Sequence, residues 1–178
     1  MSRKVGLAGF ALLFGLSGGV QAATAHVTFV NPENFRFIGR YGDAHEAATN
    51  QAELAHHIEH LAATKLPADQ TLDVEVLDVR LAGRADSWPY ALQDLPLVPS
   101  RANLPLGNEI RVMRPQGTWP SIKLRYQLKR GEQVVASGEE YDNDMRYLDR
   151  ANSYPSDDAL RYEKQMLDRW FQSKLIQR

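Results

Sequence analysis

A short run of histidines around one glutamate has the clearest capacity for chemistry in this sequence. His56, Glu59 and His60 match the H-x-x-E-H pattern of inverted zinc peptidases. In that pattern the two histidines bind Zn²⁺ and the glutamate activates a water molecule. A metal-dependent hydrolase that uses these three residues is therefore one function to consider.

The predicted helix around this run argues against a catalytic zinc. Ile58 lies at the centre of the apolar stripe, so His56 and His60 fall about 160° away on either side, toward solvent. A catalytic zinc also needs a third ligand and a partly dry cleft, and the sequence offers neither. We expect exposed histidines, weak adventitious binding of Zn²⁺ or Ni²⁺ by His56 and His60, no metal site and no cofactor.

Basic side chains alternate along two predicted strands. They are Arg111 in the first strand and Lys123, Arg125 and Lys129 in the second. If these strands are neighbours, the four side chains form one basic face. A turn at Arg130-Gly131 would pair Arg125 with Ala136 and leave Glu140 near Lys123. That describes a solvated, partly compensated surface, and a site for an anionic ligand or partner is the alternative.

Aromatic residues beside prolines form a third candidate site. Trp88 and Tyr90 lie in a long loop, and Trp119 precedes the alternating strand. Such residues either form a rigid recognition surface or cap the open end of a small core. If the chain has a recognition surface, we expect it at Trp88, Tyr90, Arg111, Trp119 and Arg125.

The elements that must position these residues follow from hydrophobic periodicity. Strands are expected at 26–30, 71–82, 110–113, 122–129 and 133–141. A helix from Asp43 to about Thr64 has a capping box with Glu46 and an apolar stripe of Ala47, Gln51, Leu54, Ile58, Leu61 and Ala62. Ser156 can cap a second helix, whose buried stripe is Leu160, Leu167, Trp170, Phe171 and Leu175.

The order of these elements predicts an α+β fold. It has a mixed sheet of about five strands, with a β-α-β unit followed by antiparallel strands, and two packing helices. In the strand 71–82 the apolar residues change parity, so either both faces are covered or a bulge near Leu77-Asp78 switches the buried side. Residues 84–109 carry four prolines and are expected to form a long loop.

The first residues read as a secretory signal peptide. Arg3 and Lys4 precede an apolar stretch from Val5 to Leu16 that is too short to span a membrane. We expect cleavage after Ala22, with Ala25 as the alternative, and a single domain over 23–178. The 178 residues include no cysteine, which excludes disulfides and a lipid anchor on cysteine and fits a bacterial periplasm. A net charge of −1 argues against nucleic-acid binding.

Several segments together resemble one bacterial family. They are Val27-Thr28-Phe29-Val30-Asn31-Pro32, Leu77-Asp78-Val79-Arg80-Leu81-Ala82-Gly83, Trp119-Pro120-Ser121-Ile122-Lys123-Leu124-Arg125-Tyr126, Asp144-Met145 before Tyr147-Leu148, and Leu160-Arg161-Tyr162-Glu163-Lys164 with Leu167-Asp168-Arg169-Trp170-Phe171. The chain resembles the proteobacterial domain of unknown function 3016. The resemblance implies an exported envelope protein and brings no established activity or catalytic residue.

These observations predict a periplasmic binding or accessory protein without catalysis. Its partner would be an envelope protein or a small ligand, and neither a membrane span nor a lipid anchor is expected. The hydrolase on His56, Glu59 and His60 is the alternative function. A module that pairs with another envelope protein through a sheet edge is a third.

Overall fold

A four-stranded mixed sheet forms the centre of the computed structural model, which describes residues 22–35, 37–38, 44–87, 109–113 and 117–177. The strand order is β1-β2-β5-β6, with β1 at Thr24–Phe29, β2 at Gln70–Arg80, β5 at Ser121–Arg130 and β6 at Gln133–Asn143. β1 and β2 are parallel, and the other two pairs are antiparallel. The predicted α+β fold with a mixed sheet and a β-α-β unit is confirmed.

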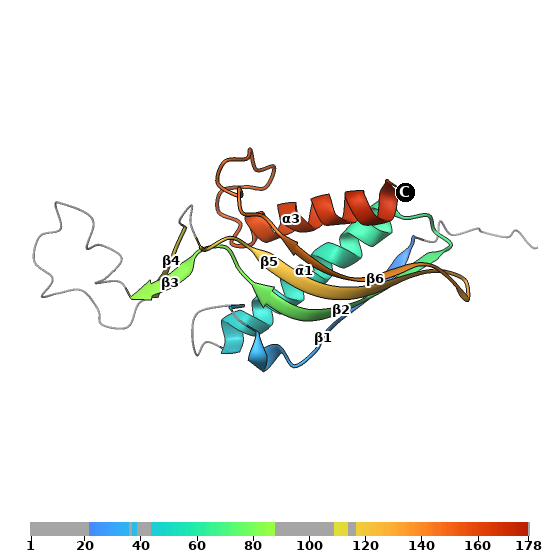
Figure 1. Cartoon of the computed structure of the whole chain (residues 1–178), viewed down its shortest axis with the longest axis horizontal. Helices are drawn as coiled ribbons and strands as arrows, with labels where there is room; N and C mark the ends of the chain where they lie inside the picture. Colours follow the sequence, from blue (N-terminus) through green and yellow to red (C-terminus); the bar gives the residue numbers. More distant parts are fainter. Residues whose placement is uncertain (1–21, 36, 39–43, 88–108, 114–116, 178) are drawn as a thin grey trace, which may run out of the picture.

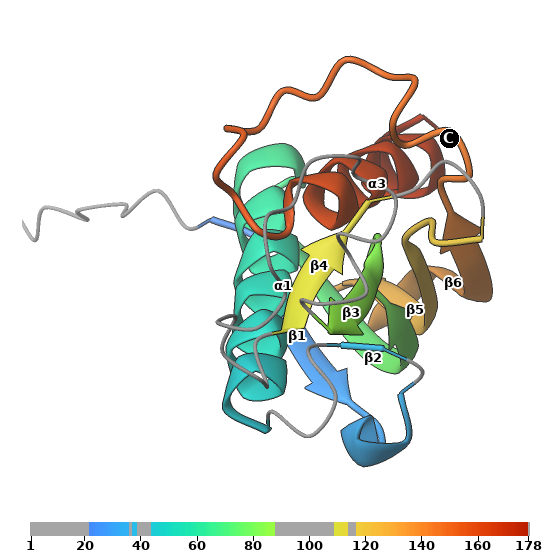
Figure 2. The same ribbon diagram turned by 90° about the vertical axis from the view of Figure 1, so that its left-hand side faces the viewer.

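Two helices cover one face of this sheet (Figure 1 and Figure 2). A short 3₁₀ helix, η1 (Pro32–Asn34), follows β1, and α1 (Ala44–Lys65) then crosses over to β2. α3 (Arg161–Phe171) continues into a π-helical turn, η3 (Gln172–Ile176). The core lies between the helices and the sheet, where Ile58, Leu124 and Leu167 are almost fully buried. The opposite face of the sheet carries polar and charged side chains.

A β-bulge in β2 explains the change of parity in its apolar residues. The register between β2 and β5 shifts between Val76 and Asp78, so Leu77 is an extra residue. Val76 and Val79 are therefore both buried on the helix-covered side, although they differ in parity. Of the two predicted alternatives, the bulge is correct.

The hairpin between β5 and β6 differs from the predicted register. Arg130 pairs with Gln133, so the turn consists of Gly131 and Glu132, and a second shift follows between Leu128 and Lys129. As a result Arg125 lies opposite Glu139 rather than Ala136. Glu140 lies opposite Leu124 and forms an ion pair with Lys174 at 2.9 Å, not with Lys123. Val134 and Val135 at this second bulge are both exposed, so no change of parity among buried residues locates it in the sequence.

A separate two-stranded ribbon occupies the ends of the predicted loop 84–109. β3 (Arg84–Ser87) and β4 (Glu109–Val112) are antiparallel to each other, so 84–87 and 109 are strand residues, not loop residues. Gly83 has a φ of +83°, and a Cβ there would lie 2.8 Å from the Met113 sulfur and 2.9 Å from the Val112 oxygen. Only glycine permits this conformation and this close approach at the base of the ribbon.

The two helices differ from prediction mainly at their beginnings. Asp43, the expected cap of the first helix, lies outside the described residues. The second helix begins at Arg161, so Ser156 does not cap it. The cap position is Leu160, which has no side-chain cap, and the preceding Asp158 carboxylate accepts the Leu160 N–H at 2.8 Å and the Lys164 ammonium at 2.7 Å. All five residues of the predicted stripe, from Leu160 to Leu175, are buried.

Candidate functional site

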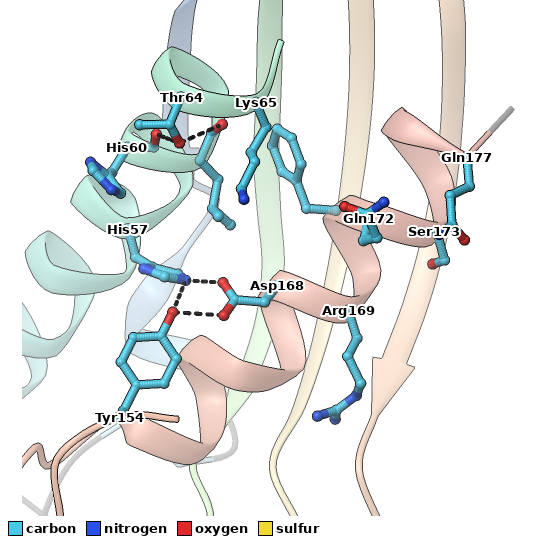
Figure 3. Close-up of a pocket in the computed structure, with 12 residues that line it drawn as sticks. His57, His60, Thr64, Lys65, Tyr154, Asp168, Arg169, Gln172, Ser173 and Gln177 are labelled. Atoms are coloured by element: carbon cyan, nitrogen blue, oxygen red, sulfur yellow. Dashed lines mark hydrogen bonds and ion pairs between the residues drawn. The ribbon is translucent and has the colours of Figure 1, made fainter. Parts of the chain in front are cut away.

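Three polar side chains from separate segments meet where α1 faces α3 (Figure 3). His57 lies on α1, Asp168 on α3, and Tyr154 in the segment that precedes α3. The His57 Nε2 and Asp168 Oδ1 atoms are 2.9 Å apart, and the Tyr154 hydroxyl donates to Asp168 Oδ2 at 2.7 Å. The Tyr154 ring also meets the His57 ring edge to face, with centroids 5.7 Å apart. We call these three residues the His57 cluster.

Packing around each member fixes the His57 cluster. His57 follows Leu54 by three residues and precedes Leu61 by four, so it lies beside the buried stripe of α1 and is only 8% exposed. Asp168 follows Leu167, which is completely buried on α3. Tyr154 is placed by Asn152, whose side-chain oxygen accepts the Tyr154 N–H at 2.9 Å.

The electrostatics of the His57 cluster indicate an ionised carboxylate. Burial acts to raise the pKa of Asp168, but hydrogen bonds from His57 and Tyr154 outweigh it and lower the pKa below its usual value. Burial and the hydrogen bond to Asp168 raise the pKa of Tyr154 well above its usual range. Tyr154 therefore remains a neutral donor, and both carboxylate oxygens of Asp168 already have partners.

A cavity of about 660 Å³ adjoins the His57 cluster, and we call it the α1–α3 cleft. Its lining includes His57, His60, Leu61, Lys65, Tyr154, Asp168, Phe171 and Gln172. A second cavity of about 650 Å³ is also lined by His57 and Tyr154, together with His56, Glu53 and Lys164. His57, His60 and Tyr154 border both cavities.

Lys65 supplies the cleft with a cation. It is the last residue of α1, and its side chain extends toward the space between the two helices (Figure 3). It has no ion-pair partner among the described residues, although its charge contributes to the lowered pKa of Asp168. Arg169 also lines the cleft, but its guanidinium bonds Asp144 at 2.6 Å. Of the lysine and arginine residues that line the cleft, Lys65 is therefore the one without an ion-pair partner among the described residues.

Of the three described residues of the predicted recognition surface, Arg111 and Trp119 both lie against Ala82, and Arg125 lies on the open face of the main sheet. Trp88 and Tyr90 lie outside the described residues. Arg111 lies on β4, which pairs with β3 and not with β5, so Arg111 and Arg125 do not share the predicted basic face. Trp119 packs partly buried against a small cluster of Ala82, Tyr147 and Tyr162. The binding role of the five residues stays a prediction.

Both arginines of that surface have protein partners. The Arg111 Nη2 atom lies 2.7 Å from the carboxylate of Glu163, which is 1% exposed, and Arg111 also donates to the Ala82 carbonyl. Arg125 bonds Glu75 at 2.7 Å and Glu139 at 3.1 Å on the open face of the sheet. Lys123 and Lys129 of that face are likewise paired, with Glu139 and Asp73. This arrangement is the compensated surface that the sequence favoured.

The histidine run is divided by the helix. His56, Glu59 and His60 are exposed, as expected, whereas His57 is buried, so the expectation that every histidine of the run faces solvent was wrong for His57. Its spacing from Leu54 and Leu61 was a signal that sequence reasoning missed. Within the described ranges, no group of three or more His, Asp or Glu side chains is arranged to hold a metal ion. Nor does any helix there have the length and apolar character to cross a membrane.

Comparison with known proteins identifies the family. Residues 23–173 match the model of the family described as "Protein of unknown function (DUF3016)". No curated protein and no solved structure matches the chain. The matched region contains α1, α3, the four strands of the main sheet and all three residues of the His57 cluster. The chain therefore belongs to the DUF3016 family.

Proposed function

We propose that this chain is an exported periplasmic protein that binds a small ligand in the α1–α3 cleft without catalysing a reaction. The observation that carries the proposal is a cavity of about 660 Å³ with the His57 cluster in its wall. Cavities of roughly 300–1,000 Å³ suit small molecules. Ionisable side chains that gather at such a concavity are typical of binding and catalytic sites.

The two aliphatic hydroxyl groups of the cleft favour binding over nucleophilic catalysis, and the Tyr154 hydroxyl donates its proton to Asp168. The Thr64 hydroxyl donates to the His60 carbonyl at 2.7 Å, and the Ser173 hydroxyl donates to the Trp170 carbonyl at 3.1 Å. Both hydroxyls thus bond their own helix, and neither bonds His57. A nucleophile activated by histidine would need a hydrogen bond to the imidazole.

Ligand-induced stabilisation tests this site. Differential scanning fluorimetry with a panel of organic acids, amino acids, sugars and nucleotides is expected to find a compound that raises the Tm of the wild-type protein. His60→Ala removes an exposed imidazole at the cleft and should reduce that shift. His45→Ala removes an exposed imidazole from the first turn of α1, away from the cleft, and should preserve it. A panel without effect, or equal shifts in both variants, would contradict the proposal.

The proposal of export rests on the leader sequence. Its pattern of Arg3 and Lys4, an apolar stretch and small residues is that of a cleaved signal peptide. Cleavage after Ala25 would remove Ala23, which is 5% exposed in the core, together with two residues of β1. Cleavage after Ala22 leaves β1 whole, and this supports Ala22 as the cleavage site.

Fractionation and intact-mass measurement test the export. The full-length chain expressed in a Gram-negative host should appear in the periplasmic fraction, with a mass that corresponds to a first residue of Ala23. The variant Ala22→Arg should accumulate as the uncleaved precursor, because the position before the cut requires a small residue. Wild-type protein that stays in the cytoplasm with residues 1–22 attached would overturn this part of the proposal.

A further inference from the structure

Lys65 is the charged residue of the α1–α3 cleft that forms no ion pair within the described residues, although its ammonium is close enough to Asp168 to contribute to the lowered pKa of that carboxyl. Both carboxylate oxygens of Asp168 already accept hydrogen bonds, one from His57 and one from Tyr154. The Lys65 side chain is exposed, its ammonium has three N–H donors, and it forms no ion pair within the described residues. An incoming anion would complete this site, whereas an incoming cation would compete with the donors that already serve Asp168.

The remaining wall of the cleft has an apolar part and an amide part. Leu61 and Phe171 line it with hydrocarbon. Gln172 and Gln177 line its far side, and no side-chain hydrogen bond of either is formed within the described residues. In Figure 3, Lys65 and Gln172 approach the cleft from opposite helices. A ligand with one anionic end, an apolar body and room for one further polar group matches this distribution.

We infer that the cleft binds a small monocarboxylic acid, with its carboxylate on the Lys65 ammonium and its apolar body against Leu61 and Phe171. The inference deepens the proposed function, on which it rests, by naming the ligand class. A carboxylate bonded to an ammonium forms a charge-assisted hydrogen bond, which is stronger than a bond between neutral groups. Leu61 and Phe171 are only 6% and 1% exposed, so the apolar contact removes little area from water and the Lys65–carboxylate bond supplies most of the affinity.

A pair of probes that differ only in charge tests the inference. Benzoate and benzamide have nearly the same shape, but only benzoate is an anion. NMR titration of the ¹⁵N-labelled mature protein should show shifts at cleft residues with benzoate, and at least roughly tenfold weaker binding of benzamide. Equal binding of both probes would overturn the inference and leave the proposed function intact. The absence of shifts with either probe would also overturn it.

A matched pair of lysine variants locates the carboxylate. Lys65→Met keeps most of the aliphatic chain and removes the ammonium, and it should weaken benzoate binding about tenfold. Lys174→Met removes an ammonium from the neighbouring turn η3, where Lys174 bonds Glu140, and it should change benzoate binding less than about twofold. Equal effects of the two variants would show non-specific attraction and would overturn the inference. In one further outcome, a neutral compound from the panel binds the wild type but not His60→Ala, and benzoate does not bind the wild type. The inferred ligand class would then be wrong, and the cleft would remain the binding site.

Discussion

His57 is held by one carboxylate and one phenol from segments far away in the chain. Its partner Asp168 lies 111 residues further along, and Tyr154 lies 97 residues further along. The two donors and the carboxylate form a closed set of hydrogen bonds at a half-buried position. Each member of the set limits the rotamers of the other two. Because His57 lies on α1 and Asp168 on α3, their hydrogen bond also holds the two helices together at the wall of the cleft.

Replacing Asp168 should destabilise the protein in a pH-dependent way. Asp168→Asn is expected to lower the free energy of unfolding by about 1 kcal/mol at pH 7, a moderate value because the Asp168 side chain is 33% exposed. The pKa of Asp168 in the folded protein lies below its ordinary value of 3.8, so the unfolded state takes up a proton first as the pH falls. The additional free energy of unfolding of the wild type over Asp168→Asn is therefore complete at pH values above the ordinary pKa of Asp168. It disappears as the pH falls through the pKa of Asp168 in the folded protein.

Urea unfolding of both proteins from pH 7 down to pH 2.5 measures this difference. Asp149→Asn is the control, because the exposed Asp149 side chain has Arg146, at 3.6 Å, as its one ion-pair partner among the described residues. A difference between wild type and Asp168→Asn that stays constant over the whole range would show that ionisation of Asp168 contributes nothing.

Among the elements, the ribbon β3–β4 is joined to α3 by the buried pair of Arg111 and Glu163. Glu163 lies in the first turn of α3, and its carboxylate also accepts the Ala82 N–H at 2.5 Å, at the base of β3. Burial raises the pKa of Glu163, and the Arg111 guanidinium opposes that rise. The pair therefore connects three elements at a point where the Glu163 side chain is 2% exposed and the Arg111 side chain 19% exposed.

Removal of Arg111 should be costly because it leaves an unpaired buried carboxylate. Arg111→Met is expected to reduce the free energy of unfolding by about 3 kcal/mol at pH 7. Without Arg111, the pKa of Glu163 in the folded protein should rise further. The loss of stability should therefore become smaller toward acidic pH, where Glu163 binds a proton in the folded state. Chemical unfolding at pH 7 and pH 5 measures both effects.

Two further variants complete the test of this buried pair. Glu163→Gln in the Arg111→Met background should recover part of the stability, because it removes the uncompensated charge. Arg125→Met on the open face of the sheet should cost much less, since that ion pair is exposed to water. Equal losses for Arg111→Met and Arg125→Met would contradict the role assigned to Arg111.

For the molecule as a whole, one apolar layer between two helices and a sheet supplies most of the stability. The main core includes residues of α1, β2, β5 and α3 in a single cluster. Trp170 lies in it with 3% exposure and meets Tyr126 edge to face, with ring centroids 5.7 Å apart. A core shared by all these elements favours unfolding in a single cooperative step.

Unfolding experiments check this cooperativity. Circular dichroism and tryptophan fluorescence should give the same urea midpoint for the mature protein. Leu124→Ala, at a fully buried position of β5, is expected to cost about 2–5 kcal/mol. Val134→Ala, at a position of β6 that is 47% exposed, should cost well under half as much. Two separate midpoints for the two signals would show that the helices and the sheet unfold independently.

The sequence by itself determined the elements of the main sheet and the buried faces of both helices. Strand alternation and helical spacing are local, and burial of one face is enough to produce them, as for Leu54 and Ile58 on α1. The parallel pairing of β1 and β2 followed from the helix between them. Even the bulge at Leu77 was one of two alternatives that its parity allowed.

Only the tertiary structure decided which polar side chains meet. The pairs His57–Asp168 and Arg111–Glu163 join residues 111 and 52 positions apart. Their contact depends on how two helices cross and where a ribbon attaches, and no local period encodes either. The candidate site is therefore absent from the sequence pattern, although His57 alone was marked by its place beside the apolar stripe. The register of β5 and β6 was hidden for another reason, because Val134 and Val135 at the bulge of β6 are both exposed and no change of parity among buried apolar residues marks it.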